Sequence, residues 1–210
     1  YTNFFESSIK EIENFLKKEV IVLKREDLEN KLEKIVEEGK DKNIAILVYG
    51  DPFFATTHIS LKIEAYRKGI KLKTIHSSSI LPSVFEVGLS CYKFGKIVSI
   101  PLKSKYENLP YSIYESIKKN LMNELHTLCL LDLDKEKNEF LKPNDAINIL
   151  LEAEKIYKEK VLDENKEMIV VCRLGFKDKA IFFDKAKNLL EKNYGNPPYV
   201  CLLYTSPSPR

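Results

Sequence analysis

An uninterrupted apolar run followed by a tight turn places the strongest constraint on the fold of this chain. Residues 44–49, Ile-Ala-Ile-Leu-Val-Tyr, show no polar alternation, which is typical of a strand buried on both faces in a parallel sheet. A Gly-Asp-Pro sequence at 50–52 predicts a turn, and Thr56 or Thr57 can cap a helix after it. Because ligands of open α/β sheets bind beyond the carboxyl ends of strands, we expect residues 50–58 to contribute to a binding site.

The charge balance of the chain argues against a broad nucleic-acid surface. The 34 basic and 31 acidic residues leave a net charge of +3, whereas such a surface usually needs a larger and clustered basic excess. The lysines between Lys34 and Lys42 alternate with acidic residues, which indicates a solvated helix face. At 210 residues, 44% of them apolar, the chain can bury a core as one domain or as two small ones.

The cysteines and histidines are too scattered to predict a metal site. The four cysteines form no Cys-x-x-Cys pair, and the three histidines lie far apart, so no zinc site and no metal ligand is expected. Cys129 and Cys172 stand inside apolar runs, where a free thiol behaves as a small buried hydrophobe, as in a reducing cytosol. The chain also has neither a long uncharged apolar stretch nor a signal peptide. We therefore expect a cytoplasmic protein that does not enter a membrane.

Strand-like and helix-like segments alternate along the chain, which predicts an α/β architecture with largely parallel strands. The strands are expected at 20–23, 44–49, 70–76, 97–100, 126–132, 168–172, 180–183 and 199–203. The helices are expected at 9–16, 28–36, 57–68, 82–92, 112–121 and 143–160, with a short one ending near 192.

The best domain boundary lies near 79–82. We expect an N-terminal α/β domain at 1–79 and a C-terminal α/β domain at 80–203, with two strand-end loops, 50–58 and 131–134, facing a cleft. The chain begins at Tyr1 without a methionine, and residues 204–210 show no periodicity. We interpret those last residues as a non-native or artefactual tail that could begin as early as Cys201.

No motif for covalent catalysis or phosphate binding is present in the sequence. Gly-x-Gly-x-x-Gly, Walker-type and Gly-x-Ser-x-Gly patterns are absent, so no catalytic residue is predicted. We interpret His58, His76 and His126 as structural. Asp51 suits a turn and a cleft rim equally well, and the serines at 77–79 either cap the next helix or donate to a ligand.

Six motifs together carry a family resemblance. The segments 50–58 (GDPFFATTH), 75–80 (IHSSSI), 92–95 (YKFG) and 126–133 (HTLCLLDL), with Arg173-x-Gly175 and the GNPP of 195–198, resemble the motifs of the diphthine synthase family in the same order. That family is similar to the tetrapyrrole methylases. The resemblance implies two α/β domains with the cofactor, S-adenosyl-L-methionine, in the cleft between them, and it implies a homodimer.

The resemblance also implies an activity. Members of the family methylate the amino group of a 3-amino-3-carboxypropyl-modified histidine on translation elongation factor 2, a step toward diphthamide that yields diphthine. Transfer from a sulfonium to an amine is an in-line displacement, so positioning and exclusion of water matter more than acid–base chemistry. Two alternatives stay open: a corrinoid or precorrin methyltransferase of the same fold, and a non-catalytic α/β binding module.

The family's cofactor contacts can be carried over where the motifs match. Phe85 and Leu174 depart from the family, which has smaller residues at both places. The family's opening strand with its Gly-Leu-Gly-Leu loop would precede Tyr1, and its Gly-x-Leu-His segment is replaced by 204–210, so the fragment is expected to bind cofactor poorly. The positions implied as cofactor contacts are Asp51, Phe54, Ser79, Ile80, Leu131 and Leu174.

Overall fold

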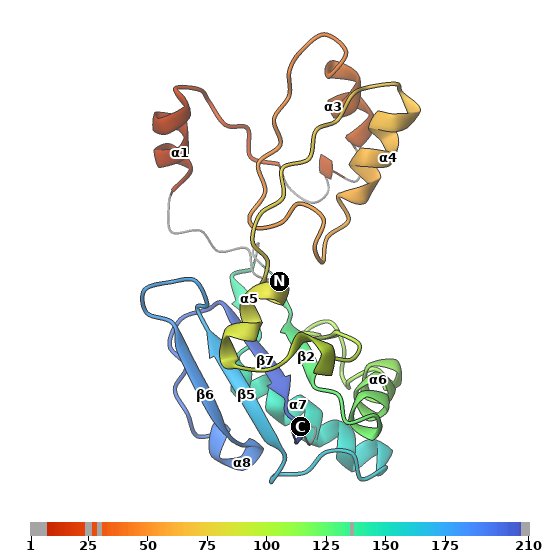
Figure 1. The fold of residues 1–210 in the computed structure, drawn as a ribbon, viewed down its shortest axis with the longest axis vertical. Coiled ribbons are helices and arrows are strands. Elements are labelled where there is room, and N and C mark those ends of the chain that lie inside the picture. The colour runs from red at the N-terminus through yellow and green to blue at the C-terminus, as the bar shows by residue number, and fades with distance from the viewer. Residues whose placement is uncertain (1–7, 24–26, 29–30, 135–136, 207–210) are drawn as a thin grey trace. The chain divides into compact units, whose positions relative to one another are not determined.

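The computed structural model describes residues 8–23, 27–28, 31–134 and 137–206 of the chain. The chain folds into two compact units. We call Thr2–Ser79 the N-terminal unit and the unit that holds Ile80–Arg210 the C-terminal unit, and each is considered by itself (Figure 1).

Three helices form the regular structure that is described in the N-terminal unit: α1 (Ile9–Leu16), α3 (Leu32–Glu38) and α4 (Ile59–Arg67). Ser8 and Glu11 form a capping box at the start of α1, in which each side chain accepts a hydrogen bond from the other residue's backbone. α3 ends at Gly39, the predicted stop. α3 and α4 pack on each other, and each buries one small apolar residue, Val36 and Ala65.

The strands predicted at 20–23, 44–49 and 70–76 are wrong for this structure. In the described part of the N-terminal unit these segments run without strand hydrogen bonds, and large apolar side chains on them, such as Ile21, Leu47 and Ile75, are exposed. A strand requires a neighbour whose backbone pairs with it in register. The sequence pattern therefore predicted strands for which the described part of this unit supplies no pairing partner.

A five-stranded sheet in the order β1-β2-β7-β5-β6 forms the C-terminal unit. Only β1 and β2 are parallel, while β2–β7, β7–β5 and β5–β6 are antiparallel. The predicted parallel pairing is therefore wrong for most of this sheet. Residues 173–179 between β5 and β6 are too few for a parallel crossover and suffice for a hairpin. The strands are β1 (Val98–Ile100), β2 (Thr127–Leu131), β5 (Glu167–Cys172), β6 (Ala180–Lys185) and β7 (Tyr199–Leu203), and β3 (Leu133–Asp134) pairs with β4 (Glu139–Phe140) in a separate ribbon.

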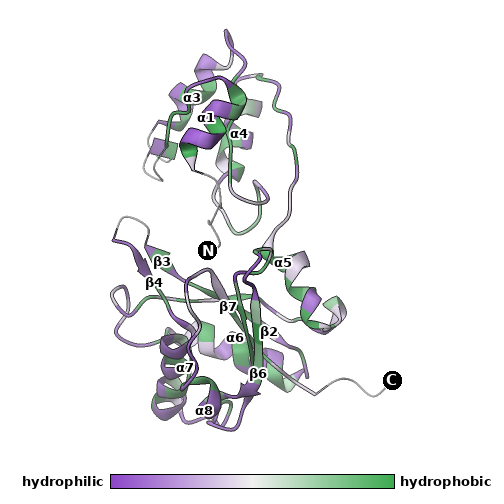
Figure 2. Ribbon diagram, turned by 90° about the vertical axis from the view of Figure 1, so that its left-hand side faces the viewer, coloured by the Kyte–Doolittle hydropathy of each residue, from purple (hydrophilic) through white to green (hydrophobic). Residues whose placement is uncertain are grey.

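One face of this sheet carries the main hydrophobic core. Helices α6 (Tyr111–Met122), α7 (Pro143–Tyr157) and α8 (Ala186–Leu189) contribute buried residues to one cluster with alternate residues of the strands. Figures 1 and 2 show α5 (Ile80–Ser83) on the opposite side of the sheet from α7. The sheet is thus covered on both faces, which explains why β2 and β7 are buried along their whole lengths.

The helix predicted at 82–92 is replaced by three short pieces. α5 passes into the 3₁₀ helix η1 (Val84–Val87), and a second 3₁₀ helix, η2, spans Cys91–Lys93. Gly88 has a φ of 88°, a left-handed conformation that ends a helix. Phe85, which departs from the family, packs edge-on against Phe94 with ring centroids 5.2 Å apart. The bulky residue thus packs within the C-terminal unit.

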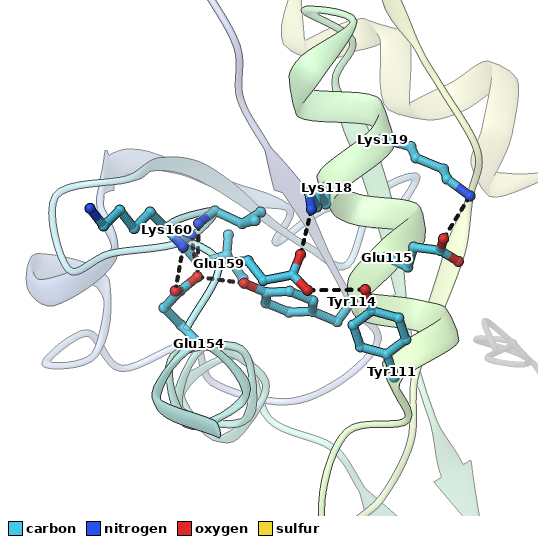
Figure 3. Close-up of polar contacts among 10 residues, drawn as sticks. Tyr111, Tyr114, Glu115, Lys118, Lys119, Glu154, Glu159 and Lys160 are labelled. Carbon is cyan, nitrogen blue, oxygen red and sulfur yellow. Dashed lines mark hydrogen bonds and ion pairs between the residues drawn. The ribbon is translucent and has the colours of Figure 1, made fainter. Parts of the chain in front are cut away.

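A polar network joins α6 to the end of α7 (Figure 3). The Tyr114 hydroxyl donates to Glu154 Oε2 over 2.7 Å, and the backbone N–H groups of residues 160, 161 and 162 donate to the same carboxylate over 2.7–2.9 Å. α7 ends before this turn, at Tyr157, because Lys158 adopts a left-handed conformation with φ 56°. Burial opposes ionisation of Glu154, but the hydrogen bonds from Leu162, Tyr114, Val161 and Lys160 outweigh it and lower its pKa.

The chain continues past β7 in contact with the C-terminal unit. Tyr204 stacks on the buried His126 with ring centroids 5.2 Å apart, and the Thr205 backbone N–H donates to His126 Nδ1 over 3.1 Å. Residues 207–210 of the predicted tail lie outside the described residues. None of the helices within the described ranges is both long enough and apolar enough to cross a membrane.

Candidate functional site

Asp51 ties the loop of residues 50–58 to the segment that precedes Ser79. Its Oδ1 accepts a hydrogen bond from the Phe53 backbone N–H over 2.9 Å, and its Oδ2 lies 2.8 Å from His76 Nδ1. The Ser77 backbone N–H makes a longer contact of 3.4 Å to the same oxygen. Three donors therefore converge on one carboxylate, which holds two segments 25 residues apart in one place.

These donors keep Asp51 ionised. The hydrogen bond from the Phe53 N–H, followed by those from His76 and Ser77, lowers the pKa of Asp51 against an opposing effect of burial. A carboxylate only accepts hydrogen bonds, so His76 Nδ1 must carry the proton. The loop thus holds a fixed negative charge with a neutral or cationic imidazole beside it.

The backbone of the loop explains why glycine stands at position 50. Gly50 has a φ of 75°, and a Cβ there would lie 3.0 Å from the carbonyl oxygen of Ser78. Only glycine avoids both the backbone strain and the close approach. At the other end of the loop, His58 Nδ1 donates to the Pro52 carbonyl oxygen over 2.9 Å. The loop is therefore fastened at its start and at its end.

The other predicted contacts of the first half lie near this cluster in sequence. Phe54 is half-buried in the same loop, three residues after Asp51, and Ser79 follows the serines that approach Gly50 and Asp51. Ile80 is buried at the start of α5 and belongs to the C-terminal unit. The structure thus brings the 50–58 and 75–79 motifs together within the N-terminal unit. The roles of Phe54, Ser79 and Ile80 as contacts stay predictions.

The two predicted contacts of the C-terminal unit lie at one edge of its sheet. Leu131 ends β2, and Leu174 comes two residues after the end of β5. Both strands are antiparallel to β7, which lies between them, so β2 and β5 run in the same direction. Their carboxyl ends therefore share an edge, where ligands of α/β proteins bind.

Arg173 organises this edge by joining two of the motifs. Its Nη1 donates to the carbonyl oxygens of Tyr194 and Asn196 over 2.7 and 2.5 Å, and its Nε lies 2.7 Å from Asp178 Oδ2. Its own backbone N–H donates to the Pro198 carbonyl oxygen over 2.8 Å. A planar guanidinium serves several acceptors at once, so Arg173 fixes the 195–198 turn beside Leu174.

The third pair of motifs meets where β2 begins. The Gly95 N–H donates to the His126 carbonyl oxygen over 2.9 Å, and the His126 N–H donates to the Lys93 carbonyl oxygen over 2.7 Å. A Cβ on Gly95 would lie only 2.2 Å from Oδ1 of the buried Asn120. The six motifs thus associate in three pairs: 50–58 with 75–79, 92–95 with 126–133, and 173–175 with 195–198.

Sequence reasoning missed the part that His76 plays. The sequence interpretation gave His76 a structural role, and its spacing of 25 residues from Asp51 follows no local period. The one available signal was that His76 ends one predicted strand, at 70–76, and Asp51 closely follows another, at 44–49. Only the packing of those segments places the imidazole against the carboxylate.

The described residues offer no other obvious reactive centre. Within them, no cluster of three or more histidine, cysteine, aspartate or glutamate side chains is placed to hold a metal ion. Burial raises the pKa of Cys129 to about 12 and that of Cys172 to about 11, so these thiols are not nucleophiles at neutral pH.

The sequence pattern of one known family covers most of the chain. The family described as tetrapyrrole (corrin/porphyrin) methylases matches residues 5–190. The chain belongs to the tetrapyrrole methylase family. The α/β fold class predicted from the sequence is thereby confirmed, with mixed rather than largely parallel pairing in the C-terminal sheet.

Individual members of the tetrapyrrole methylase family show a closer likeness. The chain is 39% identical over 199 residues to a diphthine synthase of Methanococcus vannielii, covering 94% of this chain and 77% of that protein. It is 41% identical over 196 residues to a diphthine synthase of Staphylothermus marinus, covering 91% and 70%. The crystal structure of a putative diphthine synthase from Entamoeba histolytica superposes with a TM-score of 0.86 at 32% identity, covering 100% of this chain and 81% of that one.

These likenesses confirm the resemblance to diphthine synthases that the six motifs carried. Membership of a methylase family, together with relatives that are named as synthases of diphthine, indicates a methyltransferase. The Asp51 cluster suits that chemistry, because it offers a fixed carboxylate and an exposed imidazole without a nucleophile.

Proposed function

We propose that this protein is a diphthine synthase: an S-adenosyl-L-methionine-dependent N-methyltransferase of diphthamide biosynthesis. Its substrate is the amino group of the 3-amino-3-carboxypropyl-histidine on translation elongation factor 2. The observation that carries the proposal is the identity of 35–41% to curated diphthine synthases, sustained over 91–95% of the chain. A chance likeness of a single Gly-Asp-Pro loop would not extend so far.

The charge of the 50–58 loop fits a cationic methyl donor. Asp51 is the only acidic residue of the loop, and the loop contains no lysine or arginine. Both Asp51 oxygens already accept hydrogen bonds within the N-terminal unit, so its charge acts at a distance rather than through a new bond. The donor supplies a methyl group that is already activated on a sulfonium.

The residues of the chain then have to bind the methyl donor, orient it toward the amine and exclude water. In this proposal Phe54 supplies an apolar side chain beside the charge, and the backbone groups around Ser79 and Ile80 grip the polar parts of the donor. Leu131 and Leu174, at the shared edge of the C-terminal sheet, have the same role. Precise positioning can supply most of the acceleration of such a displacement.

The proposal extends to partners and place of action. We propose that the protein acts as a homodimer in the cytoplasm, where translation factors are found, and that it binds elongation factor 2 rather than nucleic acid. The near balance of basic and acidic residues supports the last point.

The deciding experiment is methyl transfer to the modified factor. The full-length protein is incubated with elongation factor 2 that carries the 3-amino-3-carboxypropyl group and with methyl-labelled S-adenosylmethionine; unmodified factor is the control. We expect label on the modified histidine alone. Donor binding without any label would reject the assignment, and label on a corrinoid precursor instead would favour the related corrin methyltransferases.

A further inference from the structure

The Asp51–His76 pair has one functional atom that the structure leaves free. His76 is 72% exposed while Asp51 is only 16% exposed, so the imidazole stands on a half-buried carboxylate and faces outward. Nδ1 is engaged with Asp51 Oδ2 at 2.8 Å. Among the described residues, no hydrogen bond engages Nε2. The exposed nitrogen therefore carries a lone pair whenever the ring is neutral.

The orientation of this imidazole is set from several sides. Asp51 cannot turn away, because its Oδ1 is held by the Phe53 N–H at 2.9 Å. The Phe53 ring lies 6.4 Å from the His76 ring, and the Lys62 ammonium of α4 lies 5.5 Å from the centroid of the Phe53 ring. Asp51 thus contacts His76 directly, and the Lys62 ammonium lies over the Phe53 ring beside it. A carboxylate that accepts a hydrogen bond from one nitrogen of a histidine holds the ring in one orientation and so fixes the direction of the other nitrogen.

We propose that His76 is the catalytic base of the methyl transfer and that Asp51 is its positioning residue. This inference rests on the function proposed above. It assigns to the 75–80 motif a chemical role that the sequence interpretation did not give it. Ser79, a predicted donor contact, lies three residues after His76 on the same segment, which supports a base close to the donor site.

The reaction needs such a group because the acceptor amine is protonated at neutral pH and then has no lone pair for attack. An N–H bond of the ammonium breaks as the proton moves to His76 Nε2. The freed lone pair forms a bond to the methyl carbon, whose bond to sulfur breaks, and the sulfonium donor leaves as a neutral thioether. The exposed imidazolium then returns its proton to water, so one proton is released for each methyl group transferred.

The test is a substitution that keeps the donor to Asp51 and removes the base. In His76→Asn the side-chain amide can still donate from near the Nδ1 position, but nothing replaces Nε2. We expect kcat to fall by roughly 10²- to 10⁴-fold, with the affinity for S-adenosylmethionine, measured by calorimetry, within about twofold of wild type. We also expect imidazole to restore part of the activity of His76→Ala. Because the acceptor ammonium must then lose its proton to water, the residual rate of His76→Asn should rise with pH more steeply than the wild-type rate.

The comparison variant is His58→Asn, the same change at a histidine that fastens the same loop through a carbonyl oxygen; we expect its kcat to fall much less than that of His76→Asn. Asp41→Asn, in an exposed turn of the same unit, should turn over like wild type. Nitrogen-15 NMR gives a measurement that needs no methyl donor. It should show the proton of the neutral His76 imidazole on Nδ1. If wild type transfers methyl groups and the kcat of His76→Asn is within about threefold of it, His76 is not the catalytic base, while the proposed methyltransferase function is retained. Equal losses in the two variants would assign the effect to loop structure and also overturn the base. A wild type that binds donor but transfers nothing would overturn both proposals.

Discussion

Asp51 serves two purposes with one carboxylate. Its oxygens satisfy the Phe53 N–H and His76, which fixes the shape of the loop, and its charge remains on the loop because those donors lower its pKa. Gly50 makes this possible, because any side chain there would meet the Ser78 carbonyl oxygen. At the scale of single residues, the candidate site depends on positions where very few residue types fit.

Replacement of Asp51 by asparagine removes the charge and retains the size of the side chain. We expect the affinity of the full-length protein for S-adenosylmethionine to fall roughly five- to tenfold, measured by calorimetry at pH 7.5. Asp41→Asn, in an exposed turn of the same unit, should bind like wild type. Equal affinities of wild type and Asp51→Asn would remove Asp51 from the site.

The pH dependence of the Asp51 effect follows from the direction of its pKa shift. The pKa is lower in the folded loop than the value of about 3.9 expected for an unfolded chain. The stabilisation by the charge is therefore fully present above that value and is lost as pH falls through the folded pKa. Protonation of Asp51 should therefore not abolish the difference in affinity between wild type and Asp51→Asn at any pH from 5 to 8. A difference that disappears within that range would contradict the shift.

Gly95 is the second residue at which only glycine fits. Gly95→Ala would place a methyl group 2.2 Å from Asn120 Oδ1, while Asn120 is held by Lys96 and Thr127. We expect a loss of about 1–3 kcal/mol in the free energy of unfolding, as for overpacked cores, measured by urea denaturation. Asn120→Ala removes the clashing group, so the two changes combined should cost less than their sum. Strict additivity would indicate that the clash is relieved in another way.

At the scale of elements, the ends of helices and strands decide where polar groups gather. Glu154, near the end of α7, accepts hydrogen bonds from the backbone N–H groups of the turn that follows. Tyr114 of α6 donates to the same carboxylate. Arg173 acts in the opposite direction at the turn of 195–198, where its guanidinium donates to the carbonyl oxygens of Tyr194 and Asn196. Both side chains satisfy backbone groups that no helix or strand can satisfy.

Removal of the Glu154 carboxylate should weaken the packing of α6 on α7. Glu154→Ala leaves three backbone donors and the Tyr114 hydroxyl without their acceptor, so we expect a loss of about 2–3 kcal/mol in the free energy of unfolding. Glu152→Ala on the same helix breaks an exposed ion pair with Lys103 and should cost less than about 1 kcal/mol. Urea denaturation of both variants measures the difference. Similar costs for the two would show that the network adds no stability.

At the scale of the whole molecule, the two units differ in how much apolar surface they bury. The C-terminal unit has a continuous core between its sheet and α6, α7 and α8. In the described part of the N-terminal unit the buried apolar side chains are Val36 and Ala65. Local stability follows buried apolar contacts and paired backbone groups, so the N-terminal unit should open first.

Limited proteolysis measures this difference directly. We expect trypsin to cut first within residues 40–79, leaving a resistant fragment that contains the sheet of the C-terminal unit, identified by mass spectrometry. If the 50–58 loop contacts the methyl donor, saturating S-adenosylmethionine should slow tryptic cleavage near this loop. The donor binds only the folded N-terminal unit, so it lowers the fraction of molecules in which that unit is locally unfolded. Cleavage of both units at equal rates would contradict the proposed order of stability.

The sequence by itself determined the local elements and the family. The helices α1, α4 and α6, the start of α7 at Pro143, and strands β1, β2, β5, β6 and β7 all lie within about two residues of their predicted places, because periodicity, caps and turn residues are local signals. The six motifs carried the likeness to diphthine synthases. At 44–49 and 70–76 the pattern predicted strands, but a pattern within one segment does not show whether a neighbouring strand is available to pair with it.

Only the tertiary structure decided which segments meet. It made the C-terminal sheet mostly antiparallel, broke the helix predicted at 82–92, and joined the six motifs in three pairs. It also placed His76 on Asp51, which no spacing of residues could foretell. The physical reason is that strand pairing and side-chain contacts are chosen by the packing of distant segments, and a sequence pattern records only what each segment requires of its own neighbours.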